Sequence, residues 1–171
     1  MANTKYGVVR TDNMFGTKIG TGLASVRYMG TDGNTPTEIE NGCVVKVGAL
    51  IAGEREVHVG GDVAANDKIS EVVLIAAPEV DYDERKKNLD DYINEAGKNI
   101  RGYHFHTNDT FSVTKECLTG AAKPVIGDIV ELAAGTKMKV VKSVTEGSTV
   151  IGKIIDIEVA GRYTYYVIEV A

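Results

Sequence analysis

Apolar and polar positions alternate most clearly in the C-terminal part of the chain. The runs 125–132, 149–159 and 163–170 are rich in β-branched and aromatic residues that recur with a two-residue period. In the second run this period places Ile155 and Ile157 on one face of an extended strand. Such residues suit a pleated, half-buried surface better than a helix. The pattern therefore predicts three β-strands near the C-terminus.

A short motif opens three of the predicted strands, in which a glycine precedes a group of apolar residues. The glycines are Gly42, Gly127 and Gly152, and each either permits a positive φ or lets neighbouring backbone approach closely. Further apolar runs bring the expected total to eight to ten strands; they are 39–47, 54–59, 72–77, 100–106, 109–113 and 137–141. The continuous apolar run 72–77 predicts a strand buried on both faces. We expect a mainly β protein, a small β-barrel or sandwich.

One segment has a helical period. Asp81 and Glu84 have the spacing of a capping box, and the apolar residues after them recur at i, i+4 and i+7, at Leu89, Ile93 and Ala96. The sequence therefore predicts one inserted α-helix at about 82–96, within an insertion at 81–97.

Residues 1–37 differ from the rest, because glycine and threonine separate isolated apolar residues there. We predict an extended N-terminal arm at 1–37, followed by a β-barrel domain at 38–171. Residues 1–30 hold four cations, at Lys5, Arg10, Lys18 and Arg27, against Asp12 alone, although the whole chain has a net charge of −5. This asymmetry indicates an interaction arm. The alternatives are a chance distribution of few charges and a strand pair folded back on the barrel.

The bulk composition excludes some classes of partner. A net charge of −5 argues against nucleic acid as the main partner, because phosphate binding needs a basic surface. No run of 18 apolar residues is present, so we expect no transmembrane span. The N-terminus lacks the apolar core of a secretory signal, which favours a protein made and retained, or assembled, in a cytoplasm.

Residues that could react or bind a metal ion are few and scattered. Cys43 and Cys117 lie beside apolar strand residues, where cysteine behaves as a small buried hydrophobe; a bridge between them is the alternative. His104 and His106 have the spacing of two metal ligands on one strand face, but a zinc site needs further ligands. Two imidazoles on the exposed face of a strand are the simpler interpretation, so we predict no metal site.

The common catalytic motifs are not found. The chain contains no nucleophile elbow, and the glycine-rich stretch 16–22 matches neither a Walker pattern nor a dinucleotide fingerprint. The paired carboxylates near 81–91 are explained by the cap and wet face of the expected helix. We therefore predict no catalytic residues, no cofactor and no enzyme.

Four stretches together resemble small virion proteins of tailed bacteriophages, encoded beside the major capsid protein and known as head decoration or structural proteins. These stretches are 5–12 (KYGVVRTD), 39–47 (IENGCVVKV), 82–89 (YDERKKNL) and 161–169 (GRYTYYVIE). The resemblance implies a β-rich virion protein that binds the outside of a capsid, often as a homotrimer, and that is assembled in the host bacterial cytoplasm. It carries no catalytic residues.

The resemblance also gives the arm a use. The arm would add a strand to the capsid protein's sheet and pair with acidic surface, through seven residues, namely Tyr6, Arg10, Phe15, Lys18, Ile19, Arg27 and Tyr28. Deleting residues 2–30 is then expected to leave a folded barrel that no longer decorates heads. The alternatives are another virion component, such as a tail, baseplate or head-fibre base protein, and a small-ligand-binding β-barrel or enzyme.

Overall fold

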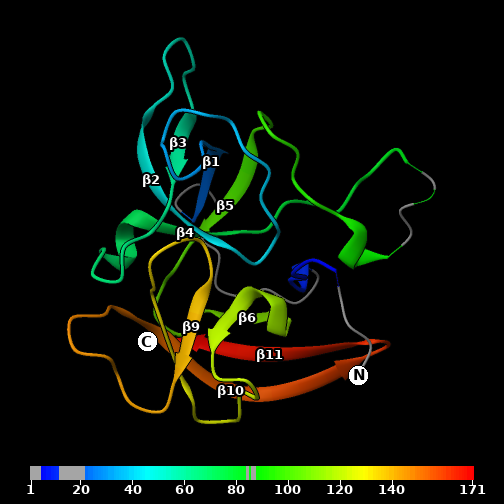
Figure 1. The fold of residues 1–171 in the computed structure, drawn as a ribbon, viewed down its shortest axis with the longest axis vertical. Helices are drawn as coiled ribbons and strands as arrows, with labels where there is room; N and C mark the ends of the chain where they lie inside the picture. The colour runs from blue at the N-terminus through cyan, green and yellow to red at the C-terminus, as the bar shows by residue number, and fades with distance from the viewer. Residues whose placement is uncertain (1–4, 12–21, 84, 86–87) are drawn as a thin grey trace.

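The computed structural model of the chain describes residues 5–11, 22–83, 85 and 88–171. Its strands form two sheets (Figure 1). The first is a closed barrel with the strand order β1 (Leu23–Tyr28), β3 (Val57–Gly61), β2 (Val44–Leu50), β4 (Val72–Ile75) and β5 (Ile100–His104). β1 closes it by pairing parallel to β3 and antiparallel to β5.

The second sheet has six strands. Their order is β6 (Thr110–Val113), β11 (Tyr163–Val170), β10 (Val150–Ala160), β8 (Ile129–Glu131), β9 (Met138–Val141) and β7 (Leu118–Gly120). All neighbours are antiparallel except β7 and β9. Three short 3-10 turns complete the described elements: η2 (Ile69–Glu71), η3 (Leu89–Asp91) and η4 (Lys115–Cys117). The predicted mainly β architecture, with a barrel, is confirmed.

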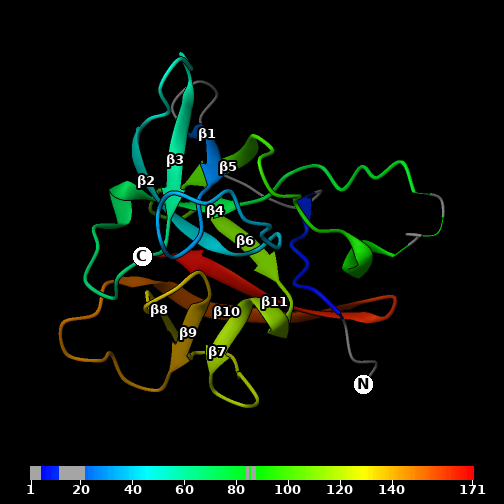
Figure 2. The same cartoon turned by 45° about the horizontal axis from the view of Figure 1, so that its top comes forward.

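The β4 strand belongs to both hydrophobic cores. Val72 and Leu74 point into the core of the six-stranded sheet, whereas Val73 and Ile75 point into the barrel. All four side chains are buried, so the prediction of a strand covered on both faces is confirmed. The barrel strand β4 therefore also covers the core of the six-stranded sheet. That sheet lies below the barrel in Figure 2.

The motif glycines serve the two purposes expected of them. Gly42 and Gly127 have φ of 80° and 93°, in the left-handed region that side chains with a Cβ disfavour. Gly152 instead lies against β11, where a Cβ would overlap the carbonyl oxygen of Glu169. Close approach of β10 and β11 therefore depends on glycine at 152.

The predicted α-helix at 82–96 is not confirmed. The described residues of this stretch form one 3-10 turn, η3, inside a long loop between β4 and β5 that extends to the right in Figures 1 and 2. The Asp81 carboxylate accepts a hydrogen bond from the Asp83 N–H at 2.9 Å, and such local bonds compete with a helix. Asn94 is held in an extended bridge with Ile39. Glu84, the second capping-box residue, lies outside the described residues.

The described parts of the expected N-terminal arm pack on the rest of the chain. Val8 and Val9 are buried, and Val9 forms a β-bridge with Val113 of β6. β1 is a barrel strand with partners on both edges. This packing matches the alternative of strands folded back on the barrel. Because β1 closes the barrel, deletion of residues 2–30 is now expected to open it, which corrects the expectation that the truncated barrel stays folded.

Candidate functional site

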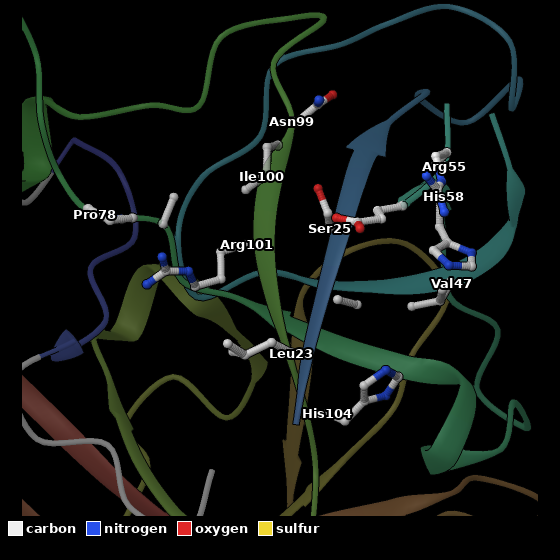
Figure 3. A pocket seen from close by; sticks show the side chains of 13 residues that line it. Leu23, Ser25, Val47, Arg55, His58, Pro78, Asn99, Ile100, Arg101 and His104 are labelled. Atoms are coloured by element: carbon white, nitrogen blue, oxygen red, sulfur yellow. The ribbon is translucent and has the colours of Figure 1, made fainter. Parts of the chain in front are cut away.

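Two imidazoles lie at the rim of the barrel. His58 is the register partner of Val26, and His104 that of Val73. Residues opposite one another in paired strands share a face, and both valines belong to the barrel core, so both rings are on the inner side. They border a hollow of about 860 Å³, shown in Figure 3.

The surroundings of the two rings differ. His58 Nδ1 lies 2.9 Å from the carbonyl oxygen of Gly48; since a carbonyl oxygen only accepts, Nδ1 carries the proton. Burial lowers the pKa of His104, and the neighbouring imidazoles of His106 and His58 lower it further. The hollow is therefore bordered by one imidazole, that of His104, whose charged form is disfavoured.

His106 does not join this pair. It follows the end of β5, and its Nδ1 lies 3.4 Å from Oδ2 of Asp109. Both His104 and His106 are half-buried, so the expectation of two imidazoles on one exposed strand face is wrong. Within the described ranges, no group of three or more His, Cys, Asp or Glu side chains is arranged to hold a metal ion.

Both cysteines are free and buried, as their sequence context predicted. Burial raises the pKa of Cys43 to about 11 and raises that of Cys117 as well. A thiol with a raised pKa is a poor nucleophile at neutral pH. Both thiols thus serve packing.

Four of the seven predicted arm residues lie in the described part of the chain, and three of those side chains bind within it. Arg10 pairs with Glu158 at 2.7 Å, and Arg27 bonds to Asn99 and Glu54. The buried Tyr28 hydroxyl donates to Asp62 at 2.6 Å. Tyr6 is half-buried beneath the Lys5 ammonium, which is 4.8 Å from its ring centroid. The remaining predicted arm residues, Phe15, Lys18 and Ile19, lie outside the described residues.

One end of the six-stranded sheet presents large apolar side chains among lysines. β8 and β9 are antiparallel, with Ile129 opposite Val141, so the segment before β8 and the segment after β9 lie at the same end. Val125, Ile126 and Val144 there are 40%, 60% and 49% exposed. We define the basic pole as Lys123, Val125, Ile126, Lys142, Val144 and Lys153.

The basic pole borders an apolar hollow of about 330 Å³. Its lining residues include the aliphatic Ile129, Val144, Val150 and Val170 and the polar Thr107, Asn108, Lys153 and Glu169. Between residues 121 and 153 the chain carries five lysines and three carboxylates. The local charge is therefore positive in a chain whose net charge is negative.

Two buried carboxylates hold the segments of the basic pole in place. Asp128 accepts the Val125 N–H at 3.0 Å and pairs with the Lys142 ammonium at 2.7 Å. Glu131 has no exposed surface; it pairs with Lys139 at 3.0 Å and accepts the backbone N–H and hydroxyl of Thr145 at 2.9 and 2.6 Å. Each exposed apolar group thus sits beside a hydrogen-bonded anchor.

The hydrogen bonds also explain the ionisation of Glu131. Burial opposes its negative charge, but the Thr145 hydroxyl and N–H, together with the Lys139 ammonium, outweigh burial and hold the pKa of Glu131 below its ordinary value. The carboxylate is therefore charged at neutral pH. Its role is to fasten the 142–149 segment to β8.

A second apolar surface, of opposite charge, lies on the long loop after β4. Val80 is 68% exposed and Tyr82 is 98% exposed. Asp81 and Asp83 flank Tyr82, and Glu79 precedes Val80. We name residues 79–83 the acidic loop. Tyr82 and Asp83 fall within the predicted helix at about 82–96, so the exposure of Tyr82 could not be inferred from the sequence.

Asp90 fastens the same long loop to the rest of the chain. Its carboxylate is buried and accepts hydrogen bonds from the Lys5 N–H at 3.2 Å, the Arg162 guanidinium at 2.9 Å and the Tyr163 hydroxyl at 2.7 Å. Burial raises the pKa of Asp90, but these donors outweigh burial and hold it below the ordinary value. One carboxylate thereby joins the N-terminal segment, the long loop and the β10–β11 hairpin.

Comparison with family models, curated proteins and solved structures gives no match. The function is therefore argued from the residues of the chain itself. Among the described residues, no helix is long and apolar enough to cross a lipid bilayer.

Proposed function

We propose that this chain is a structural protein of a phage virion, which binds the outer surface of the capsid and stabilises or decorates it. The major capsid protein is its partner, and the assembled protein belongs to the virion. The resemblance of four stretches to head decoration proteins supports this proposal. So does the surface of the molecule, where large apolar side chains are held in fixed positions.

The observation that carries the proposal is the pairing of exposed apolar groups with buried anchors. Ile126 and Val144 lie in water at an energetic cost, because apolar surface is stabilised by burial. Nearby, Asp128 and Glu131 hold their segments in place through charged hydrogen bonds. Surfaces of this kind mark sites of protein contact, and rigid ones lose little entropy on binding. Adhesion to another protein is the function they favour.

Some of the predicted arm residues are already engaged within the chain, and these are not assigned to capsid contact. Tyr28 is buried in the barrel, and Arg10 and Arg27 are engaged within the chain. We therefore assign capsid contact to Tyr6 and to Phe15, Lys18 and Ile19, which lie in the segment between Thr11 and Gly22. Many copies on one head would add the contributions of individually weak contacts.

Co-sedimentation with capsids tests the proposal. The chain is produced together with the major capsid protein encoded beside it, and heads are purified by density and examined for bound chain. A triple variant, F15S/K18E/I19S, is expected to lose binding, whereas L50S, which alters an exposed side chain at the end of β2, should bind as the wild type does. Absence of the wild-type chain from the heads would rule out the capsid role.

A small-ligand-binding barrel is a second candidate, favoured by the hollow at the barrel rim. His58, His104 and Ser25 border that hollow, and barrel mouths are common ligand sites. Calorimetric or thermal-shift screening of small polar ligands, with H104Q as the control, distinguishes this candidate. A ligand whose effect disappears in H104Q would support it.

A further inference from the structure

We infer that the acidic loop of one copy of this chain docks on the basic pole of a second copy, so that copies associate head to tail. The inference arises from the coexistence of two exposed apolar surfaces of opposite charge on one molecule. Val80 and Tyr82 lie beside Glu79 and Asp81, with Asp83 paired to Arg85 at 2.9 Å, whereas Val125, Ile126 and Val144 lie among lysines. Each surface has the charge that the other requires.

The positions of the two surfaces allow this mode of association. The loop after β4 extends to the right in Figures 1 and 2, whereas the segment after β9 extends to the left in both. Two different surfaces on opposite sides of a molecule make a heterologous contact, which produces a ring when the rotation closes and a filament when it does not. A small closed ring agrees with a homo-oligomer.

Electrostatics disfavours the two symmetric alternatives. Contact between two basic poles would place Lys123 and Lys153 against the same lysines of the other copy. Contact between two acidic loops would place Glu79 and Asp81 against carboxylates. Like charges brought together at an interface oppose association. Pole against loop is therefore the favourable arrangement of these surfaces.

The basic pole also has a receptacle for the exposed aromatic ring. The hollow of about 330 Å³ has four aliphatic lining residues, Ile129, Val144, Val150 and Val170, and is also lined by Lys153 and its strand partner Glu169. Tyrosine combines a large apolar ring with a polar tip and is a frequent anchor of interfaces. Tyr82, at 98% exposure, would bury its ring there and leave its hydroxyl near the lysine.

The basic pole is held in place before association, because Asp128 and Glu131 fasten its two segments. Little of the binding free energy is then lost in ordering the pole. With the basic pole covered by a second copy, contact with the capsid is left to Tyr6 and the segment between Thr11 and Gly22, and the two proposals are tested separately.

The test measures the mass of the purified full-length chain by chromatography with light scattering, in the absence of capsids. The wild type is expected to form an oligomer whose mass decreases at high salt, because the contact is partly ionic. The variants Y82S and V144S should each have the mass of a single chain. The control L50S alters an equally exposed side chain, 50% against 49% for Val144, and should keep the wild-type mass.

Mixing the two variants gives the decisive result. The V144S chain retains its acidic loop and the Y82S chain retains its basic pole, so an equimolar mixture should contain a dimer with one copy of each. A symmetric contact would give no such complementation. A monomeric wild type, unchanged mass in Y82S or V144S, or a mixture that contains only monomers would each overturn the inference. Failure of capsid co-sedimentation would leave it standing.

Discussion

The Tyr163 hydroxyl donates a 2.7 Å hydrogen bond to Oδ1 of Asp90, across 73 positions of sequence. Oδ2 of the same carboxylate accepts the Arg162 guanidinium and the Lys5 N–H. The tip of the β10–β11 hairpin and the long loop after β4 are therefore held together at a single buried group. Several parts of the fold without regular structure depend on it.

Replacement of Asp90 should destabilise the protein more than replacement of its tyrosine partner. Y163F removes one hydrogen bond and is expected to lower the free energy of unfolding by about 1 kcal/mol. D90N also removes the charge that Arg162 meets, and a loss of about 1–3 kcal/mol is expected. Denaturant unfolding of the two variants measures both values. Equal losses would show that the charge of Asp90 contributes nothing.

Glu131→Gln should loosen the segment that carries Val144. The amide cannot pair with Lys139 and serve both donors of Thr145, so about 2–4 kcal/mol of stability should be lost. Hydrogen exchange of the amides in 142–149 should rise with it. The control is K98M, which breaks an exposed pair with Glu95 at 3.6 Å and should change stability by less than about 0.5 kcal/mol. Unchanged exchange at Thr145 in the glutamine variant would contradict the assigned role.

Gly152→Ala should separate β10 from β11. The new Cβ would overlap the carbonyl of Glu169, which is backbone and cannot rotate away. We expect a loss of about 2–4 kcal/mol or failure to fold. Gly61→Ala is the matched control, because a Cβ on that β3 glycine meets no atom within 4 Å; its effect should stay within about 0.5 kcal/mol. The thermal unfolding midpoints of the two variants test this prediction. Equal midpoints would argue against a close approach of β10 and β11 at Gly152.

Stability should fall on acidification partly through His104. Its pKa in the folded chain is lowered by burial and by the neighbouring imidazoles, so below its ordinary pKa of about 6.5 the unfolded chain binds a proton that the folded chain resists. Stability then rises with pH in that window and is lost as the pH falls from about 6.5 through the lower folded pKa. Unfolding at pH 7.5 and at lower pH should show a smaller loss in H104Q. An identical loss in both chains would contradict this role.

The strands could be predicted from local sequence because their signals are local. The two-residue period of 149–159 and 163–170 became β10 and β11, and the unbroken apolar run after Glu71 became the doubly buried β4. The glycines also kept their expected uses, with a positive φ at Gly42 and Gly127. What the pattern could not reveal is that alternate residues of β4 serve two different cores, since that depends on strands far apart in sequence.

The expected helix shows where local signals compete. The stretch has a helical period, but Leu89 is 42% exposed and Asp90 is buried, the reverse of an amphipathic helix with its aliphatic face inward. Tertiary hydrogen bonds from Tyr163 and Arg162 draw Asp90 inward. Their contribution exceeds what helix propensity supplies per residue, which is below about 1 kcal/mol.

The exposure of the basic pole and of the acidic loop could not be predicted for a similar reason. Val125 and Ile126 read as the start of a strand, but β8 begins only at Ile129, and the two residues before Gly127 are left exposed. The sequence pattern placed Tyr82 in the predicted helix at about 82–96. Whether an apolar residue is covered depends on the neighbours that the fold brings to it, and these are not written in the adjacent sequence.

The shared β4 strand has a mechanical consequence. Since Val72 and Leu74 complete one interior and Val73 and Ile75 the other, neither half retains a full interior when the strand is pulled out. Force applied to either half must pass through this common wall, so the molecule should yield as a single block under tension.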